Sequence, residues 1–353
     1  MTLPSQQRVS VVIPARNEEV NIARVVWSLA NQVGLKEILV VDDQSTDRTA
    51  EILTALKLEI PLLRILRVES LPEGWLGKTY AVVKGAGAAT GDWLLFTDAD
   101  TVHLDGSLAE LLQRAEDGHA DLLSLSPGQE TLTWWEKSVI PFVFVKLASL
   151  FRFEEVSDPR FPAAAANGQY ILVRREIYER SGGHEAVKSA ILEDVELARR
   201  IKSLGGKLVF LPGAQWVRTR MYQSFGEMWQ GWTKNLYLLY GGNDFKMLAS
   251  VASLWLLDVL PELAFVVLCF WVAIARAGAE IMLMAVSLFI LALARQWDYG
   301  RALARLGFDA TLANYQPIGA ALLGALMLGS LRAHRASGSI QWKGRHYATK
   351  GKG

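Results

Sequence analysis

Short runs of large apolar residues alternate with amphipathic segments along the first hundred residues. The apolar runs predict buried strands, because a strand covered on both faces of a sheet reads as an unbroken hydrophobic stretch. They occupy residues 9–13, 37–41, 62–68 and 93–96. Three segments with helical character separate them, at residues 20–30, 48–58 and 78–88. This alternation predicts an α/β fold built on a parallel sheet with right-handed crossovers.

Further along the chain, strands are expected at 122–126, 170–173 and 207–211, and a helix follows Asp194. The segment from Trp134 to Phe151 is strongly apolar but contains Glu136, Lys137 and Lys146. It is short for a membrane span, so we expect an interfacial element or a core helix there.

The composition shifts near residue 240. Residues 247–275 carry only two charged side chains, residues 281–294 carry none, and residues 318–331 are rich in alanine, glycine and leucine. The first run is long enough to cross a bilayer, whereas the other two reach about 20 residues only with their flanks. We therefore predict a catalytic domain over 1–240, with interfacial elements near 134–151. A membrane region with two to three hydrophobic helices and a basic tail is predicted over 241–353.

Basic residues follow these apolar runs, and no acid follows Asp309. Such residues favour the cytoplasmic side of a membrane. If all three apolar runs crossed the membrane, the basic tail would lie on the side opposite to the catalytic domain. We favour a cytoplasmic tail, in which case one of the runs is re-entrant or interfacial. The prediction is a multi-pass protein of the cell membrane with its catalytic domain in the cytoplasm.

The overall composition further limits the classes of protein to which this chain can belong. The 353 residues are 51% hydrophobic and 21% charged, with a formal net charge of +1. This balance indicates a mixed soluble and membrane chain and no bulk attraction to nucleic acid. Cys269 is the only cysteine, which excludes a disulfide framework and a cysteine-based zinc site. The polar amino terminus is not expected to be a signal peptide.

Acidic residues stand where two predicted strands end. Asp42 and Asp43 follow the second strand, and Asp98 and Asp100 follow the strand at 93–96. Open α/β sheets bind ligands at the carboxyl ends of their strands. Asp98 and Asp100 are two residues apart, so in an extended segment their side chains point to the same face. Two carboxylates placed in this way can bind a divalent cation together with substrate phosphates. The alternative is a turn whose acids cap the next helix.

Two further candidates stand at predicted helix starts. Pro72 occupies the glycine position that a P-loop would need before Gly77-Lys78-Thr79, so that motif is rejected. Lys78 could still meet a phosphate at a helix amino terminus, or be a solvated surface lysine. Asp194 is expected in the first turn of a helix, as a functional acid or a plain cap. Among the histidines, His184 is a candidate for substrate contact, whereas His103, His119 and His334 are expected at the surface.

Taken together, segments 11–18, 40–47, 97–100 and 193–194 resemble the family 2 glycosyltransferases of the GT-A fold. The resemblance covers roughly the first two-thirds of the chain. It implies a Rossmann-like, mixed but mainly parallel sheet with flanking helices, followed here by a helical membrane region. The carboxy-terminal part resembles the lipid-modifying branch with the hopanoid-associated, carotenoid and ceramide glycosyltransferases.

The resemblance also implies roles for individual residues. Asp194 would be the general base of an inverting transfer, with Glu193 beside it, and Asp98 and Asp100 would hold Mg²⁺ or Mn²⁺. A nucleotide sugar, with a UDP-sugar favoured, would be bound by Pro14, Arg16, Glu18, Asp43, Lys78 and Asp98, with Asp43 holding the base. A lipid acceptor would lie near His184, Gln230, Trp232 and Lys234.

The chain departs from the family pattern at one motif. Processive and ceramide-type members carry Gln/Arg-x-x-Arg-Trp after the base, whereas residues 230–235 read Gln-Gly-Trp-Thr-Lys-Asn. A lysine lacks the guanidinium fork, so transfer of a single sugar to a lipid hydroxyl is preferred over polymer synthesis.

Two alternatives remain open at this point. A nucleotidyltransferase would share the fold, although it is expected to carry a glycine-rich basic loop where Pro14-Ala15-Arg16-Asn17 stands. An inactive membrane scaffold would not need its acids at Asp43, Asp98, Asp100 and Asp194.

Overall fold

The computed structural model describes residues 8–275, 278–336, 339–342 and 345–348. Residues 1–7, with most of the predicted polar amino terminus, and the tail lysines Lys343, Lys350 and Lys352 lie outside this range. The chain divides into two compact units. The first unit comprises residues 1–130 and 148–221, and the second comprises 131–147 and 222–353. The assignment of 1–240 to catalysis and 241–353 to a membrane region stays a prediction.

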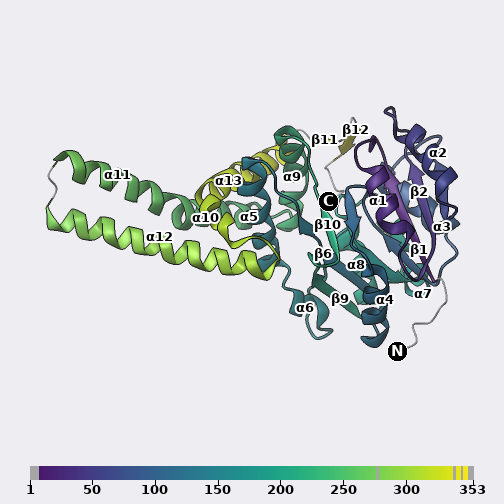
Figure 1. Cartoon of the computed structure of the whole chain (residues 1–353). Helices are drawn as coiled ribbons and strands as arrows, with labels where there is room; N and C mark the ends of the chain where they lie inside the picture. The colour runs from purple at the N-terminus through teal and green to yellow at the C-terminus, as the bar shows by residue number, and fades with distance from the viewer. Residues whose placement is uncertain (1–7, 276–277, 337–338, 343–344, 349–353) are drawn as a thin grey trace. The chain divides into compact units, whose positions relative to one another are not determined.

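A seven-stranded sheet forms the centre of the first unit (Figure 1), in the order β3-β2-β1-β4-β8-β6-β9. Its first four members in this order pair in parallel, β8 is antiparallel to both of its neighbours, and β6 and β9 are again parallel. The strands are β1 (Val9–Ala15), β2 (Leu35–Asp42), β3 (Leu63–Arg67), β4 (Trp93–Phe96), β6 (Leu122–Ser126), β8 (Ile171–Arg174) and β9 (Leu208–Pro212). The predicted mixed, mainly parallel sheet is confirmed.

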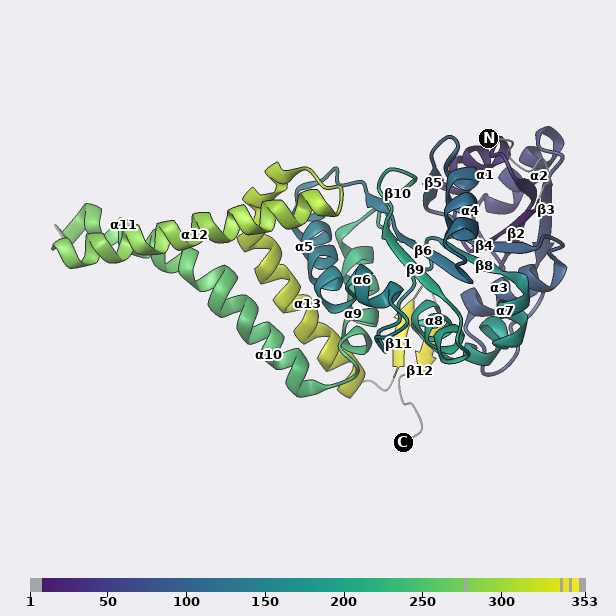
Figure 2. The ribbon, with the colours of Figure 1, turned by 90° about the horizontal axis from the view of Figure 1, so that it is seen from below.

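Helices cover both faces of this sheet (Figure 2) and give the first unit two separate cores. Val11 and Ile13 of β1 belong to one core, and Val12 between them belongs to the other, because alternate strand residues point to opposite faces. The first core includes residues of α1 (Ile22–Ala30), α2 (Thr49–Glu59) and α4 (Ser107–Asp117). The second includes residues of α3 (Gly77–Ala88), α6 (Phe153–Ser157), α7 (Arg175–Arg180) and α8 (Glu193–Ser203).

A small second sheet lies beyond the carboxyl end of β4. It joins β5 (Thr101–His103), β10 (Val217–Thr219) and β7 (Gly128–Gln129), in that order. These strands have only two or three residues each, too few to show a hydrophobic period, and the sequence did not predict them. The sheet follows the acidic turn directly and therefore helps to hold that turn in place.

The second unit is helical apart from the hairpin of β11 (Ser339–Trp342) and β12 (Arg345–Ala348). It contains α5 (Trp134–Leu150) up to residue 147, and then α9 (Phe225–Leu239), α10 (Asp244–Leu254), the π-helical turn η2 (Trp255–Val259), α11 (Leu260–Ala275), α12 (Ala279–Arg305), η3 (Ala310–Tyr315) and α13 (Gln316–Ala336). In both views α11 and α12 run side by side, and Phe265 stacks on Phe289 with ring centroids 5.2 Å apart. The ranges Asp244–Ile274 and Ala279–Arg305 are long and apolar enough to cross a membrane.

Candidate active site

Two loops at the carboxyl edge of the main sheet are bonded to each other. The Asn17 N–H donates to Ser45 Oγ at 3.0 Å, and the Thr46 N–H donates to Asn17 Oδ1 at 2.8 Å. Asn17 also adopts the left-handed backbone conformation, with φ of 54°, which asparagine tolerates better than most residues. The loops after β1 and β2 are therefore held as one structure.

Four residues predicted to bind the nucleotide lie on these two strands and their loops. Arg16 Nη1 donates to the Asp43 carbonyl at 2.7 Å, and the Asp43 N–H donates to the Ala15 carbonyl at 2.8 Å. The Glu18 carboxylate accepts from Asn21 Nδ2 at 3.0 Å, and Pro14 lines the pocket described below. Asp43 is 3% exposed, so its carboxylate is sheltered from bulk water. Nucleotide binding by these residues stays a prediction.

The acidic turn after β4 is clamped by hydroxyl groups. Thr97 Oγ1 donates to the Gln169 carbonyl at 2.7 Å, and Thr101 Oγ1 donates to the Asp98 carbonyl at 2.8 Å. His103 Nε2 lies 3.1 Å from Thr97 Oγ1. These bonds fix the backbone that carries Asp98 and Asp100.

The expectation of a surface position for His103 is wrong. The side chain is 2% exposed, and burial lowers the pKa of His103 to about 3, so the imidazole is neutral at physiological pH. His103 belongs to β5 of the small sheet, where it pairs with Val217, and its ring lies against that of Tyr170 with centroids 5.7 Å apart.

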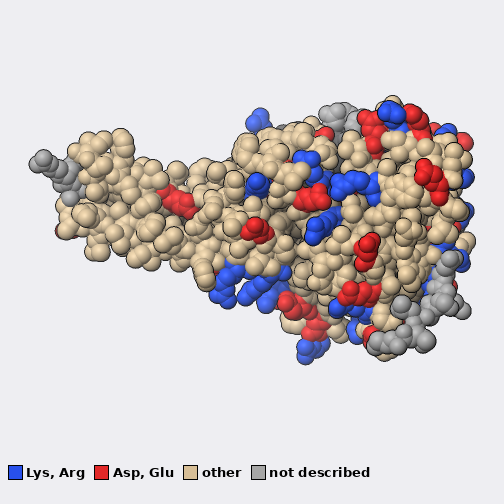
Figure 3. Space-filling model, viewed as in Figure 1, with Lys and Arg blue, Asp and Glu red and all other residues tan. Residues whose placement is uncertain are grey.

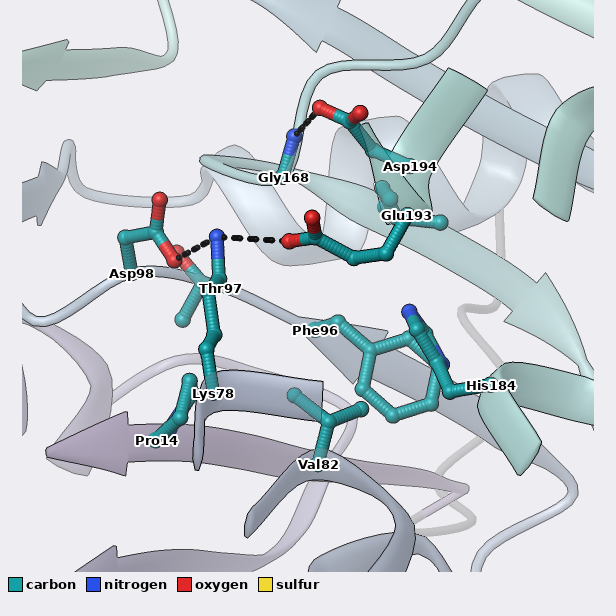
Figure 4. Close-up of a pocket in the computed structure, with 11 residues that line it drawn as sticks. Pro14, Lys78, Val82, Phe96, Thr97, Asp98, Gly168, His184, Glu193 and Asp194 are labelled. Carbon is teal, nitrogen blue, oxygen red and sulfur yellow. Dashed lines mark hydrogen bonds and ion pairs between the residues drawn. The ribbon is translucent and has the colours of Figure 1, made fainter. Parts of the chain in front are cut away.

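A pocket at this edge brings together acids from distant parts of the chain (Figure 4). Lys78 stands at its centre, with Nζ 2.8 Å from Asp98 Oδ1 and 3.1 Å from Glu193 Oε1. Burial alone would lower the pKa of Lys78, but Asp98 and Glu193 outweigh it and raise the pKa well above its usual value. The pocket is lined by Pro14, Lys78, Val82, Phe96, Thr97, Asp98, Gly168, Ile171, His184, Glu193 and Asp194.

Asp194 is held by two main-chain amides. The Gly168 N–H donates to Oδ2 at 2.9 Å, and the Val195 N–H donates to Oδ1 at 2.8 Å. Burial and the neighbouring charge of Glu193 nevertheless raise the pKa of Asp194 to about 6, against the lowering effects of Lys78 and the amides. A carboxylate with this pKa suits proton transfer near neutral pH.

Gly168 lies among three charged groups. A Cβ atom built on it would stand 2.9 Å from Lys78 Nζ, 3.7 Å from Asp194 Oδ2 and 3.8 Å from Asp98 Oδ2. These distances show that Asp194 and Asp98 face one small volume, the convergence on which the predicted reaction depends. A side chain at this position would displace the ammonium group of Lys78.

His184 lies in the floor of the pocket against Phe96, with ring centroids 4.8 Å apart. The Tyr178 hydroxyl accepts from the His184 N–H at 3.2 Å and lies 3.1 Å from His184 Nδ1. Donation of the hydroxyl proton to Nδ1 leaves the imidazole proton on Nε2, and this contact favours that tautomer. Burial, and then the charge of Lys78, lower the pKa of His184 to about 3, so the ring is a neutral donor.

The oxygen donors at the acidic turn fit a hard divalent cation. Asp98 and Asp100 provide carboxylates, and the Asp98 side chain is 27% exposed. Among the described residues, no group of three or more histidine, cysteine, aspartate or glutamate side chains could hold a metal ion. Mg²⁺ is commonly bound by one or two carboxylates together with substrate phosphates. The site therefore suits a cation that arrives with a phosphorylated ligand.

The other sequence-predicted residues lie apart from this pocket lining. Arg16, Glu18, Asp43 and Asp100 belong to the same edge of the sheet but do not line the pocket itself. Gln230, Trp232 and Lys234 lie on α9 in the second unit, and their part in an acceptor site stays a prediction.

Sequence reasoning missed the roles of Gly168, Thr97 and Tyr178, whose bonds organise the site. The strand expected at 170–173, which follows Gly168 closely, was the signal nearest to this segment.

Comparison with known proteins bears on the family and the fold. Residues 10–182 match the family described as Glycosyl transferase family 2. The 4,4'-diaponeurosporenoate glycosyltransferase of Staphylococcus aureus strain USA300 is 27% identical over 348 residues, which cover 98% of this chain and 89% of that protein. The same enzyme of strain MRSA252 has the same identity and coverage.

A solved structure has a similar fold. It is a mannosyltransferase from Pyrobaculum calidifontis in complex with GDP-Man and Mn²⁺, with a TM-score of 0.52 and 18% identity. The similarity covers 93% of this chain and 87% of that one. In agreement with the GT-A architecture and with these relatives, residues 10–182 carry a glycosyl transferase family 2 domain, and this chain is a glycosyltransferase.

Proposed function

We propose that this enzyme transfers one sugar from a nucleotide diphosphate donor to a hydroxyl group of a lipid acceptor of the carotenoid type. The observation that carries the proposal is the placement of Asp194, with its pKa raised to about 6, in one pocket with Asp98 and Lys78. Transfer needs a base on one side of the sugar and a charge-stabilising group on the other, and these residues supply both.

The donor side is built from Lys78, Asp98 and Asp100. The positive charge of Lys78, at the amino terminus of α3, faces the pocket and suits a diphosphate. Asp98 and Asp100 would hold Mg²⁺ or Mn²⁺. The cation would neutralise the negative charge that develops on the departing nucleoside diphosphate. Arg16, Glu18 and Asp43, with Pro14, are proposed to bind the nucleoside, with UDP as the favoured nucleotide.

The acceptor side is built around Asp194. Its carboxylate takes the proton of the acceptor hydroxyl while the hydroxyl oxygen bonds to the anomeric carbon. The bond from that carbon to the phosphate oxygen breaks in the same step, so the anomeric centre inverts. Glu193 is engaged by Lys78 at 3.1 Å, so it supports the charge balance of the pocket. His184 Nε2–H is a candidate donor to a sugar or acceptor oxygen.

An apolar acceptor is supported by two observations. The relative of similar length is named for the glycosylation of 4,4'-diaponeurosporenoate. The second unit also carries two helices that are apolar, long and largely exposed. The departure at residues 230–235 from the motif of processive enzymes supports addition of a single sugar.

The test is transfer of radiolabelled sugar from a panel of nucleotide sugars into extracted lipids, with mass spectrometry of the product. The full-length protein in membranes is assayed with Mg²⁺, with Mn²⁺ and with EDTA. We expect transfer that EDTA abolishes and that Asp100→Ala lowers at least a hundredfold. Glu110→Gln, on the exposed face of α4, serves as the matched control and should transfer normally. Transfer that persists undiminished in EDTA and in Asp100→Ala would refute the metal role.

A further inference from the structure

The hairpin of α11 and α12 presents apolar side chains to its surroundings. In the most apolar 18 residues of each candidate span, only 11% and 6% are buried. Neither span is therefore the core helix of a soluble domain. Figure 3 shows this hairpin almost free of charged atoms. Its exposed large side chains include Leu263, Val266, Phe270, Leu283, Val286 and Ile290. An apolar surface of this extent needs a partner.

We infer that this hairpin crosses the bilayer and returns. The first unit, which carries the candidate active site and is the catalytic unit, and the carboxy-terminal helix α13 then lie on the same face of the membrane. The inference rests on the proposed membrane location and adds its topology. The partner is the hydrocarbon core of a lipid bilayer.

The length of the hairpin matches that partner. The stretch from Trp255 to Ile274, apolar apart from Asp258 and Glu262, has 20 residues, or about 30 Å of helix at 1.5 Å per residue. Ile281 to Trp297 provides 17 residues, or about 26 Å. The hydrocarbon core is about 30 Å thick. Each arm can therefore reach across it.

Tryptophans mark both ends of this stretch. Trp255 and Trp297 are 39% and 71% exposed, and both lie close in sequence to the Asp258–Arg295 ion pair at the base of the hairpin. Trp271 is 56% exposed and stands sixteen residues, or about 24 Å, beyond Trp255. Exposed tryptophans favour the two membrane interfaces.

A buried polar cluster ties the base of the hairpin to the rest of the second unit. Asp258 of η2 accepts from Arg295 of α12, and its Oδ1 also accepts from Gln316 Nε2 of α13 at 3.0 Å. Lys146 Nζ of α5 lies 3.9 Å from Asp258 Oδ2. Charged groups inside a bilayer are costly unless they pair and face protein, and this cluster does both at the level of the base.

The third apolar run does not add a crossing. On α13, Ala320, Leu323, Leu326 and Met327 are at most 1% exposed, and the helix packs against α9 and α10. Two crossings return the chain to the side from which it started. This favours the predicted topology in which the carboxy-terminal tail and the catalytic domain lie on the same side of the membrane.

The distribution of charge assigns that side. Lys246, Arg301, Arg305 and Arg332 are exposed on segments that flank the open end of the hairpin, whereas the first turn of α12, at the other end, carries the exposed acid Glu280. Basic residues flanking a span stay in the cytoplasm. The open end, the catalytic unit and α13 therefore face the cytoplasm, and the tip faces the opposite side.

Single cysteines test this topology. In a Cys269→Ser background, Glu280→Cys reports the tip, Arg332→Cys reports the end of α13, and Lys57→Cys on α2 reports the catalytic unit. Right-side-out and inside-out membrane vesicles are labelled with a membrane-impermeant maleimide, before and after permeabilisation. We expect Glu280→Cys to label only in right-side-out vesicles, and the other two only in inside-out vesicles.

Two results would overturn the inference. Labelling of Arg332→Cys on the side opposite to Lys57→Cys would mean an odd number of crossings. Labelling of Glu280→Cys on the same side as Lys57→Cys would mean a hairpin that lies in one leaflet. Neither readout needs enzyme activity, so a failed topology is distinguished from a failed glycosyl transfer assay in the same vesicles.

Discussion

The Nζ atom of Lys78 lies 2.8 Å from Oδ1 of Asp98, which joins the amino terminus of α3 to the carboxyl end of β4. The same ammonium group reaches Glu193, the neighbour of Asp194. Lys78 thus links the proposed donor side of the pocket to the proposed base. Substitution of Lys78 should therefore affect both donor binding and proton transfer by Asp194.

The first prediction concerns pH. Asp194 must lose its proton to act as a base, so kcat/KM should rise with pH through about 6, the pKa of this carboxyl. The charge of Lys78 lowers that pKa, so Lys78→Gln should move the acid limb of the profile to higher pH as well as weaken donor binding. Lys84→Gln, on the same helix, is the control. An acid limb that stays in place in Lys78→Gln would contradict the coupling.

Replacement of the base is the second prediction. Asp194→Asn should lower kcat about 10²- to 10⁴-fold, the usual contribution of a general base. Binding of the nucleotide sugar, measured by calorimetry, should change little because the donor contacts remain. Glu196→Gln, two residues further along α8, removes an acid that pairs with Arg199 at the surface and should stay active. Near-normal kcat in Asp194→Asn would remove the proposed role.

The third prediction concerns space at Gly168. In Gly168→Ala the added methyl carbon would lie 2.9 Å from Lys78 Nζ, so the lysine must move away from Asp98 or Glu193. We expect at least a tenfold loss of kcat/KM with little change in melting temperature. Gly87→Ala on α3 is the matched control, since a Cβ there meets nothing within 4 Å and the change favours the helix. Equal activity of the two variants would show that this close approach is unimportant.

A fourth prediction addresses the orientation of His184. Tyr178→Phe removes the hydroxyl that contacts both the main-chain N–H and Nδ1 of this residue. Loss of such a bond costs about 1 kcal/mol, so we expect a two- to tenfold loss of kcat/KM. Nitrogen NMR of the imidazole should show a mixture of tautomers in place of one. Tyr315→Phe in the second unit is the control, and an unchanged tautomer in Tyr178→Phe would refute the assignment.

The fifth prediction concerns stability at the opposite edge of the sheet. Burial raises the pKa of Glu37, but hydrogen bonds from Thr90, Ser10 and Arg64 outweigh it and lower the pKa to about 2. Because the folded pKa is depressed, this stabilisation is present above the usual pKa near 4.5 and disappears as pH falls towards 2. At pH 7 it is worth up to about 3 kcal/mol.

Glu37→Gln should therefore unfold at lower denaturant concentration than the parent protein at pH 7. The difference should shrink as the pH is lowered from 4.5 towards 2. Glu51→Gln, at an exposed pair with Arg48, should show neither effect. A difference that is independent of pH would mean that the shape of Glu37, and not its charge, matters.

Much of the first unit could be predicted from periodicity. The apolar run at 93–96 coincides with β4, and the run at 122–126 coincides with β6, because strands buried on both faces tolerate few polar residues. The Asp-x-Asp pair follows β4 directly, so its place at the carboxyl edge of the sheet also followed from the sequence.

Other features depend on partners that are distant along the chain. The antiparallel insertion of β8 between β4 and β6 reflects pairing across more than forty residues, which no local pattern encodes. His103 was expected at the surface because it shows no ligand spacing, and the short strands of the small sheet to which it belongs carry no periodic signal that reveals its burial. The amide of Gly168 reaches Asp194 across 26 residues.

The sequence by itself determined which residues form strands and helices, which of them carry the acids, and to which family the chain is similar. These properties follow from hydrophobic period and from motif chemistry, both of which are local. Only the tertiary structure decided that Lys78 stands between Asp98 and Glu193, that Gly168 lies against the ammonium group of Lys78, and that one face of α13 is covered by protein. Those properties depend on burial and on electrostatic fields, which arise only when distant segments pack together.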